Sequence, residues 1–330
     1  MLTQSELEIT PPQDESPASS SQKLLVELLR TLAMQGYRFT TVTPVTHQRF
    51  LTQHQAPGTT LWDIFGWNVP FHINALSPLL RSLMIEADLL QPCGEFFKSK
   101  VRISSLANDL FLHSAFPTAQ SDAVFFGPDT YRFARFIRQT LQHCVVSSAD
   151  PVRILDIGSG SGAGGVVAVR ASRSPVDLTL NDINPLAITY ARANAAAATV
   201  EASFVHGDVF TAVHGNFDLI ISNPPYIKDA AGCAYKDGGA QLGLHLSIRI
   251  VQHAISHLAP GGRLLLYTGV AMTGRSDPLM AELRHLIADA NCHWSYEEID
   301  PDIFSEELGQ PGYGEAYRIA AVGLVVTRRK

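Results

Sequence analysis

Apolar residues recur at helical spacing in the first third of the chain, and two short apolar runs follow them. Residues 23–36 carry leucines three and four positions apart, which predicts an amphipathic helix. Residues 61–65 and 76–90 are expected to form two further helices. Residues 96–103 and 109–113 are expected to be the two strands of a β-hairpin. The pattern therefore predicts a mainly helical N-terminal unit that ends in a hairpin.

From about residue 150 the pattern changes to alternating strands and helices, after a helix that starts at Pro128 or Asp129. Short apolar runs predict strands at residues 152–157, 176–180, 202–205, 217–221, 263–267, 294–299 and 319–327. Helices are expected at residues 163–171, 183–198, 244–258 and 279–290. Such repeats predict an α/β fold with a doubly wound, mostly parallel sheet of seven strands. The last two strands have no helix between them, which predicts an antiparallel edge pair at the C-terminus.

Three segments follow from these patterns. Residues 1–22 are polar and rich in proline and serine, so they cannot bury a core and are expected to be a disordered tail. Residues 23–120 are expected to form the smaller, mainly helical domain, which resembles a winged helix. Residues 121–330 are expected to form the α/β domain.

Three basic residues alternate in the first strand of the predicted hairpin. Lys98, Lys100 and Arg102 are two positions apart, so a strand would place them on one face. Two interpretations remain open. The face contacts phosphate groups, or it is the solvated side of an edge strand.

Composition narrows the class of protein. The chain has 330 residues, 46% hydrophobic and 17% charged, and a formal net charge of -6, so no overall charge attracts it to nucleic acid or an anionic membrane. Its 4 cysteines are far apart, which predicts reduced thiols and no disulfide framework. With no apolar span or signal segment, we expect a cytoplasmic protein without a membrane partner.

His253 and His257 lie one helical turn apart, but no third ligand accompanies them and no metal is expected.

A glycine-rich stretch at residues 156–162 lies where the first predicted strand meets the first helix. Glycines there let the backbone approach a ligand closely, and the helix N-terminus supplies unpaired N–H groups. Gly158, Gly160 and Ala163 match the dinucleotide-binding fingerprint, with Asp182 at about the distance of its ribose-binding acid. A nicotinamide-dependent enzyme is therefore one interpretation.

Acidic residues at the ends of two predicted strands favour another ligand. Asp156, at the end of the first strand, is suited to an ammonium group, and Asp208, after the third, is suited to the amine of adenine. Both lie at the carboxyl edge, where such sheets bind ligands. A nucleoside with an amino-acid tail and no phosphates fits this edge better than a pyrophosphate does.

The segment Asn223-Pro224-Pro225-Tyr226 follows the fourth predicted strand. The prolines lack N–H groups and stiffen the chain, and Asn223 adds a side-chain carbonyl. Tyr226 offers a flat face for stacking. Together they are expected to hold a planar –NH2 group, with the Asn223 side chain and the Pro224 carbonyl accepting its two hydrogens.

The order of these motifs resembles that of class I S-adenosylmethionine-dependent methyltransferases, and more narrowly of HemK/PrmC-like enzymes with a small methyltransferase domain. The resemblance rests on residues 156–162, the acid after the second strand, Gly-Asp at 207–208 and Asn-Pro-Pro-Tyr at 223–226. It covers about residues 125–327. It implies a Rossmann-like methyltransferase domain over residues 121–330, S-adenosyl-L-methionine as cofactor, and an N-terminal domain that recognises the substrate.

The resemblance also implies roles for individual residues. Asp156 and the glycines after it would hold the methionine end, Asp182 the ribose hydroxyls, and Asp208 the adenine. The expected cofactor-binding residues are Phe126, Thr130, Asp156, Gly158, Ser159, Gly160, Gly162, Asp182, Ile183, Asp208, Val209 and Asn223. The expected catalytic residues are Asn223, Pro224, Pro225 and Tyr226.

The implied reaction is methyl transfer to a planar nitrogen, with the side-chain amide of a protein glutamine as the leading acceptor. The exocyclic amine of adenine in rRNA, tRNA or DNA, a small-molecule amine, and a cofactor-binding domain without turnover remain alternatives. A macromolecular partner is expected, protein rather than RNA or DNA.

The sequence departs from the family pattern at three places. Residues 227–230 replace a proline and glutamate, Tyr267 stands near the strand end where glutamate is common, and the N-terminal region differs from the release-factor-binding helical bundle. These departures weigh against release factors as the substrate.

Overall fold

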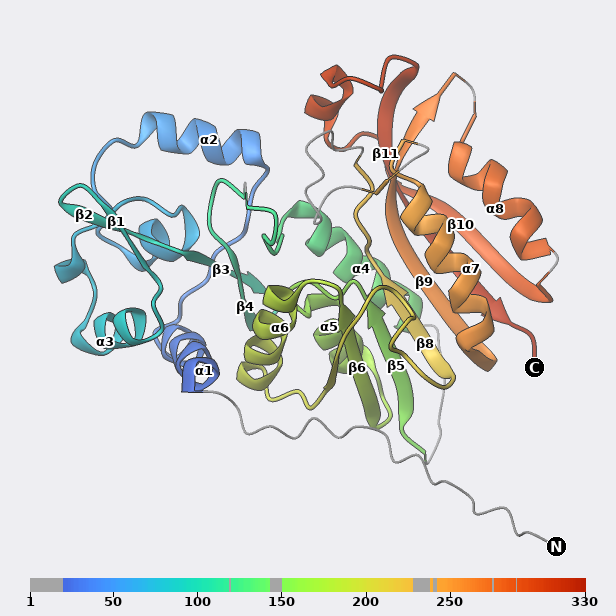
Figure 1. Cartoon of the computed structure of the whole chain (residues 1–330), viewed down its shortest axis with the longest axis horizontal. Coiled ribbons are helices and arrows are strands. Elements are labelled where there is room, and N and C mark those ends of the chain that lie inside the picture. Colours follow the sequence, from blue (N-terminus) through green and yellow to red (C-terminus); the bar gives the residue numbers. More distant parts are fainter. Residues whose placement is uncertain are drawn as a thin grey trace, which may run out of the picture.

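The computed structural model consists of a large sheet covered by helices and a smaller unit of helices and hairpins beside it (Figure 1). It describes residues 20–118, 120–142, 150–227, 238–239, 242–274, 276–288 and 290–330. Most of the predicted N-terminal tail, the segment after Ile227 and the loop around residue 147 lie outside the described residues. The last three residues assigned to that tail belong to the first helix, which begins at Ser20.

The large sheet has seven strands in the order β10, β11, β9, β8, β5, β6, β7. Strands β5 to β9 are parallel, whereas β11 runs antiparallel to both β9 and β10. The strands are β5 Val152–Ile157, β6 Val176–Asp182, β7 Ser203–His206, β8 Phe217–Ser222, β9 Leu258–Thr273, β10 Cys292–Asp300 and β11 Ala316–Arg328. The predicted doubly wound sheet and its antiparallel edge pair are confirmed.

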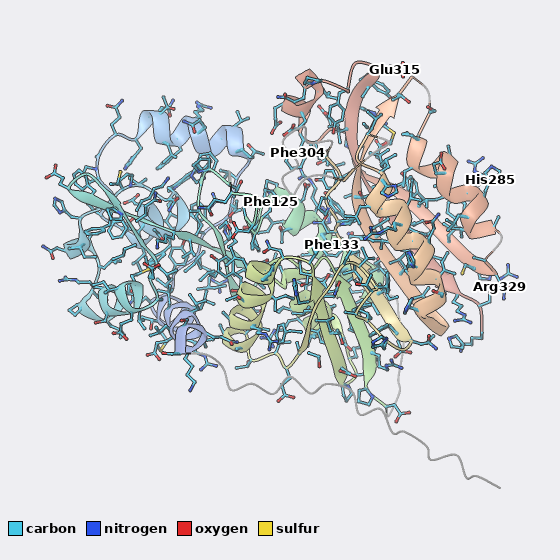
Figure 2. The ribbon with its side chains drawn as sticks, in the orientation of Figure 1. Phe125, Phe133, His285, Phe304, Glu315 and Arg329 are labelled. Atoms are coloured by element: carbon cyan, nitrogen blue, oxygen red, sulfur yellow. The ribbon has the colours of Figure 1, made fainter. Side chains whose placement is uncertain are left out.

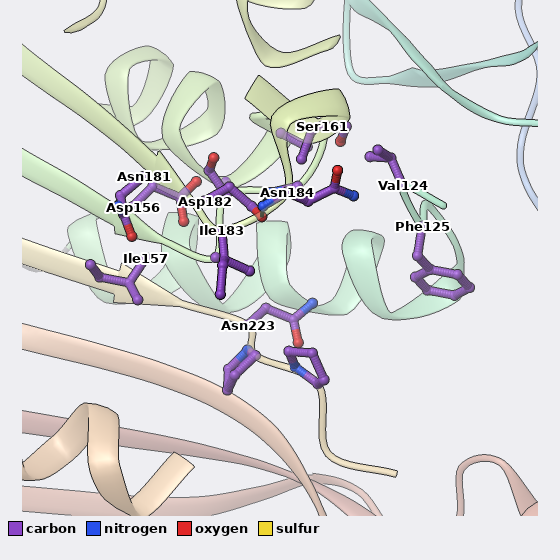
Figure 3. A pocket seen from close by; sticks show the side chains of 18 of the residues that line it. Val124, Phe125, Asp156, Ile157, Ser161, Asn181, Asp182, Ile183, Asn184 and Asn223 are labelled. Carbon is purple, nitrogen blue, oxygen red and sulfur yellow. Dashed lines mark hydrogen bonds between the residues drawn. The ribbon is translucent and has the colours of Figure 1, made fainter. Parts of the chain in front are cut away.

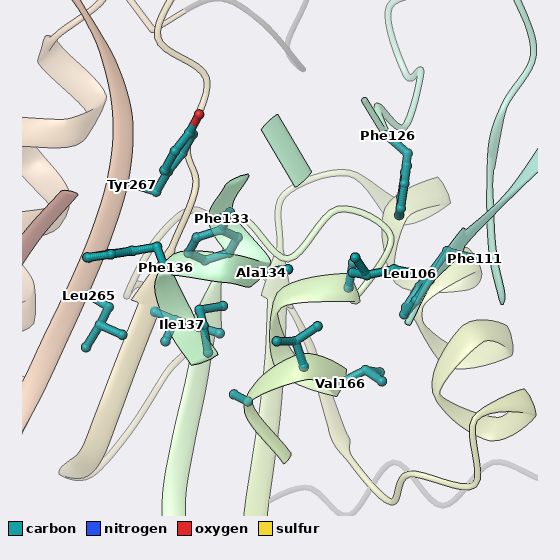
Figure 4. Packing of buried hydrophobic residues seen from close by; sticks show 14 of the residues in the cluster. Leu106, Phe111, Phe126, Phe133, Ala134, Phe136, Ile137, Val166, Leu265 and Tyr267 are labelled. Atoms are coloured by element: carbon teal, nitrogen blue, oxygen red, sulfur yellow. The ribbon is translucent and has the colours of Figure 1, made fainter. Parts of the chain in front are cut away.

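In the described part of the chain, five helices cover the sheet. They are α4 Pro128–Gln142, α5 Ala163–Ala171, α6 Pro185–Ala197, α7 His245–His257 and α8 Pro278–Ala288. Helices α4, α5 and α6 pack with one face of the sheet and α7 and α8 with the other. Successive side chains of β5 alternate between these faces: Ile154 packs on the α4 side and Leu155 on the α7 side. Asp156 accordingly lies on the side of α4 and α5. Figure 4 shows part of this core.

The smaller unit contains helices and two hairpins. Its elements are α1 Ser20–Met34, α2 Pro44–Gln53, a π-helical turn Trp62–Gly66, a 3-10 turn Ile73–Ala75, α3 Pro78–Glu86, β1 Leu90–Cys93, β2 Phe96–Ser99, β3 Val101–Leu106 and β4 Asp109–Ser114. The sequence prediction missed α2. Its start signal was present, since Pro44 lies in the first turn and the Thr43 hydroxyl accepts a hydrogen bond from the Thr46 N–H at 3.3 Å.

The predicted strand over residues 96–103 is two strands. β2 pairs with β1, and β3 pairs with β4. The Ser99 hydroxyl donates to the carbonyl of Val101 at 2.7 Å, and this local bond replaces a ladder bond where the chain changes partner. Arg102 is only 5% exposed, and its guanidinium donates to His47 at 2.9 Å. The expectation that Lys98, Lys100 and Arg102 share one face is therefore wrong.

Helix α6 joins the smaller unit to the sheet. Ala187, Tyr190 and Ala193 belong to the buried cluster of the smaller unit, while the opposite side of the helix packs on the sheet. Asn194, fully buried, accepts from the N–H of Leu112 at 2.8 Å and donates to its carbonyl at 3.0 Å. Its amide also donates to the carbonyl of Ser161 at 2.8 Å. One side chain thus ties β4 to the glycine-rich loop.

Candidate active site

A cavity opens at the carboxyl ends of β5, β6 and β8, and we call it the strand-end cavity (Figure 3). Parallel strands of this kind present their ligand sites at this edge. It is lined by Ala123, Val124, Phe125, Thr130, Phe133, Asp156, Ile157, Gly158, Ser159, Gly160, Ser161, Ala163, Gly164, Asn181, Asp182, Ile183, Asn184, Ala187, Asp208, Val209, Asn223, Pro224, Pro225, Leu246 and Ile250. The cavity therefore collects residues from several loops that are far apart in sequence.

The glycine-rich loop forms one side of the strand-end cavity. Gly158 and Gly160 have φ values of +66° and +54°, and a Cβ added to either would meet no atom within 4 Å. The open space lies where a ligand would rest against bare backbone. The N–H of Gly160 donates to the Asp182 carboxylate at 2.8 Å, so the loop is held to the end of β6.

Asp156 lies at the inner end of the cavity and is 2% exposed. Its carboxyl group accepts a hydrogen bond from the N–H of Gly165 at 2.8 Å. Burial raises the pKa of Asp156 to about 8, and the nearby Asp182 adds to this increase. A cationic ligand group at this position would favour the ionised carboxylate.

Asp182 ends β6 and faces the same cavity. Besides Gly160, its carboxylate accepts the N–H of Asn184 at 2.9 Å. Burial raises the pKa of Asp182, while these backbone hydrogen bonds oppose the increase. The next residue, Ile183, is 57% exposed and points from the strand end toward the loop of Asn223 (Figure 3). An acidic group beside an exposed apolar side chain suits a nucleoside, whose ribose offers hydroxyls and whose base offers a flat face.

Asp208, after β7, has a partner that sequence reasoning missed. Arg249 of α7 forms an ion pair with its carboxylate. Both side chains are partly exposed, and Asp208 still lines the cavity. Arg249 therefore orients this acid.

The Asn223-Pro224-Pro225-Tyr226 segment directly follows β8. The Ser222 hydroxyl donates to the carbonyl of Ile157 at 2.8 Å, which fixes the strand end beside the cavity. Asn223, Pro224 and Pro225 line the strand-end cavity and also a second one, the adjacent pocket. The buried Oδ1 atom of Asn223 has no hydrogen-bond partner among the described residues. This segment thus forms a wall common to the two cavities, and the Asn223 amide oxygen in it is an acceptor without a donor among the described residues.

The adjacent pocket lies between the smaller unit and the C-terminal loop, and Figure 2 labels Phe125 and Phe304 of its walls. Its lining consists of Pro44, Val45, Phe116, Pro117, Thr118, Phe125, Asp129, Asn223, Pro224, Pro225, Tyr226, Ile227, Phe304, Glu306 and Glu307. Aromatic and proline side chains dominate, and the charged lining residues are all acidic. The pocket can accept a planar group beside Asn223.

Most of the predicted site residues meet at these two cavities. The strand-end cavity contains Thr130, Asp156, Gly158, Ser159, Gly160, Asp182, Ile183, Asp208, Val209, Asn223, Pro224 and Pro225. Tyr226 lines only the adjacent pocket, where its hydroxyl donates to Asp129.

Phe126 and Gly162 lie outside both linings. Phe126 is 1% exposed and stacks on His113 with ring centroids 5.2 Å apart, and its neighbour Phe125 lines the cavities instead. Gly162 precedes α5, and a Cβ there would lie 3.2 Å from that of Ala191, so it permits close helix packing.

The residues present fit S-adenosylmethionine. Besides Asn223, the buried Ser159 Oγ and Asn181 Oδ1 lack partners among the described residues, and both residues line the strand-end cavity. Unpaired buried polar atoms are costly unless a ligand or water satisfies them. Acceptors and buried acids without a basic cluster suit a ligand with ammonium, hydroxyl and amine groups better than a pyrophosphate.

Comparison with known proteins agrees with this geometry. Residues 135–283 match the model of the methyltransferase small domain. This part of the chain is therefore a methyltransferase small domain of the class I S-adenosylmethionine-dependent type. More narrowly, this domain is similar to that of the HemK/PrmC-like small methyltransferases.

Two curated relatives bear on the acceptor. A release factor glutamine methyltransferase from Deinococcus radiodurans is 33% identical over 171 residues, which cover 47% of this chain and 55% of the relative. A ribosomal RNA small subunit methyltransferase C from Enterobacter sp. is 37% identical over 169 residues, or 50% of this chain and 40% of the relative. The match thus spans about half of each relative.

Among solved structures, the S-adenosylmethionine-dependent methyltransferase from Agrobacterium tumefaciens aligns with a TM-score of 0.46 and 16% identity, over 73% of this chain and 72% of that chain. Within the described part of this chain, no helix is long and apolar enough to cross a membrane. No group of three potential metal ligands occurs there either.

Proposed function

We propose that the protein methylates a planar nitrogen with S-adenosylmethionine, and that the acceptor is the side-chain amide of a protein glutamine. The observation that carries the proposal is the position of Asn223. Its unpaired amide oxygen lies in the wall shared by the strand-end cavity and the adjacent pocket. An acceptor nitrogen held by this oxygen would therefore lie next to both cavities.

S-adenosylmethionine, when bound, supplies a methyl group on a positively charged sulfur. Asp156, Asp182 and the glycine-rich loop would hold this cofactor in the strand-end cavity. Asn223 Oδ1 would accept one N–H of the acceptor amide and the Pro224 carbonyl the other, so that the nitrogen lone pair stays free. Positioning of this kind can contribute roughly 7–11 kcal/mol to catalysis. After transfer, the methylated nitrogen is acidic and loses a proton to solvent.

The charges of the adjacent pocket favour a protein over a nucleic acid. Asp129, Glu306 and Glu307 are its charged lining residues. Acidic side chains repel a polyanion and tolerate a neutral amide. Arg102, once a candidate phosphate contact, is buried instead. The similarity to a glutamine methyltransferase supports the same acceptor.

An adenine amine is the second candidate, because the same segment can hold the amine of a flipped base. One observation favours it: a third pocket, lined by Lys98 and Lys100, also contains Phe116, Pro117 and Thr118 of the adjacent pocket. Lys100 pairs with Asp88 at 2.8 Å and Lys98 donates to the carbonyl of Phe116 at 2.6 Å, so both cations have partners. The relation to an rRNA methyltransferase is consistent with this candidate.

The test uses the full chain, S-adenosylmethionine labelled in its methyl group, and a cell extract. Label that is released by protease and recovered as N-methylglutamine would support the proposal. Label released only by nuclease would replace it with the adenine reaction. Label found on small molecules would overturn both the glutamine and the adenine reaction. So would the absence of label in a protein that binds the cofactor.

A further inference from the structure

A buried carboxylate connects the two sides of the adjacent pocket. Asp129, in the first turn of α4, is 2% exposed and accepts hydrogen bonds from three side chains. The donors are the hydroxyls of Tyr226 and Tyr267, the latter at 2.8 Å, and Arg132 Nη1 at 3.0 Å. These donors come from the loop after β8, from β9 and from α4. One carboxylate thus fixes three elements.

The connection continues to the opposite side of the pocket. Arg132 Nε donates to the carboxylate of Asp300 at 2.9 Å, at the end of β10. The chain then leads to Phe304, Glu306 and Glu307, which line the pocket. The rings of Tyr226 and Phe304 make an edge contact, with centroids 6.0 Å apart and planes at 65°. Arg132 donates to the carboxylates of both Asp129 and Asp300, so it links the Tyr226 side of the pocket to the Phe304 side.

Tyr226 is held at both ends. A Cβ added to Gly269 would lie 2.3 Å from the Tyr226 ring, so the ring rests directly on the backbone of β9. The hydroxyl at the far end of the ring is bound by Asp129. Burial and the neighbouring Asp129 carboxylate raise the pKa of Tyr226, so its hydroxyl stays protonated and remains a donor. The ring is consequently a fixed wall next to Asn223.

We infer that Asp129 is a positioning residue for the acceptor, and that through Tyr226 and the Arg132–Asp300 bridge it sets the shape of the adjacent pocket. This inference rests on the proposed function, because it takes the adjacent pocket as the acceptor site. Asp129 acts through the tyrosine and the arginine, while Asn223 holds the reacting nitrogen. Asp129 affects the adjacent pocket and not the cofactor site, since it does not line the strand-end cavity.

The first test separates positioning from folding. In Asp129→Asn and Tyr226→Phe, we expect KM for capped glutamine (N-acetylglutamine methylamide) or for adenosine to rise about tenfold, which corresponds to ~1.4 kcal/mol. The dissociation constant of S-adenosylmethionine should change less than about twofold. Because the two groups act on each other, the double variant should be no worse than the poorer single variant.

A matched control removes a similar bond elsewhere. Tyr296 donates to Asp277 at 2.6 Å, and neither residue lines either cavity. Tyr296→Phe should leave KM for the acceptor unchanged, even if it lowers the free energy of unfolding. An equal KM increase in Tyr296→Phe, or an unchanged KM in folded Asp129→Asn, would overturn the inference.

A second measurement does not need an acceptor. Hydrogen exchange of full-length Asp129→Asn should accelerate at Tyr226, Ile227 and residues 303–307, with residues 158–162 unchanged. Unchanged exchange at the pocket walls would overturn the positioning role even if methyl transfer is found. Faster exchange in a protein that methylates neither glutamine nor adenine would leave the positioning role standing and reject the proposed reaction.

Discussion

The carboxyl group of Asp156 accepts a hydrogen bond from the backbone N–H of Gly165, 2.8 Å away, at the buried end of β5. This single donor does not offset burial, so the pKa of Asp156 is about 8 in the ligand-free protein. Near neutral pH the group is mostly protonated, and a cationic ligand must promote the loss of its proton.

Cofactor affinity should therefore increase as the pH rises toward about 8, because the ionised form of Asp156 attracts the ligand's ammonium group. Calorimetry in buffers of different ionisation enthalpy would detect the released proton. Asp156→Asn should bind more weakly at about pH 8 and lose most of this pH dependence. The same pH slope in the variant would remove Asp156 from the site.

The same substitution should stabilise the ligand-free protein at high pH. In the unfolded chain Asp156 has an ordinary pKa of ~4, so between about pH 4 and about pH 8 the unfolded state binds fewer protons than the folded state. The contribution of this group to the unfolding free energy then falls with increasing pH, by up to ~1.4 kcal/mol per unit. Denaturant unfolding at about pH 8 should show Asp156→Asn to be more stable than wild type, and a less stable variant would contradict the burial argument.

Asn223→Ala should reduce methyl transfer by about 100-fold, since it removes an acceptor that orients the nitrogen. Cofactor binding, measured by calorimetry, should change much less, because the glycine-rich loop and the two acids remain. Gln142→Ala, at the exposed end of α4, is the matched amide deletion and should be neutral. Turnover near wild type in Asn223→Ala would exclude the proposed role.

Gly269→Ala should lower turnover, because its new methyl group would overlap the Tyr226 ring. Cofactor affinity should be retained, since Gly269 does not line the strand-end cavity. Gly314→Ala is the matched control, because a Cβ there meets nothing within 4 Å. Equal effects of the two substitutions on kcat/KM would argue against a fixed Tyr226 wall.

Asn194→Ala should lower the free energy of unfolding by about 2–4 kcal/mol, because three buried hydrogen bonds are lost and Leu112 is left unpaired. Denaturant unfolding would measure the loss. A change under about 0.5 kcal/mol would mean that α6 does not join the two units as strongly as its contacts indicate.

Strands β5, β6 and β8 were predictable because each contains a short apolar run next to polar residues. β5 and α5 begin and end where the pattern placed them, and β6, β8 and α7 agree within two residues. The motifs also predicted most of the strand-end cavity, since parallel strands bring their carboxyl ends to one edge. Asp156, Asp182 and Asn223 accordingly lie together.

The sequence did not predict contacts made between distant elements. Asp129 was read as a helix start, and nothing local indicates that Tyr226 and Tyr267 would share its carboxylate. The Arg249–Asp208 pair joins residues 41 apart. Arg102 was misplaced because periodicity along a strand says nothing about where the strand changes partner.

The wall that separates the two cavities has a consequence for the order of events. Of the residues that the structure describes, only Phe125, Asn223, Pro224 and Pro225 belong to both linings. Cofactor and acceptor would touch at this wall and nowhere else, so neither has to cross the other's space to enter or leave. With the acceptor in the adjacent pocket, as proposed, we expect a random-order kinetic scheme in which the spent cofactor is exchanged while the acceptor stays docked.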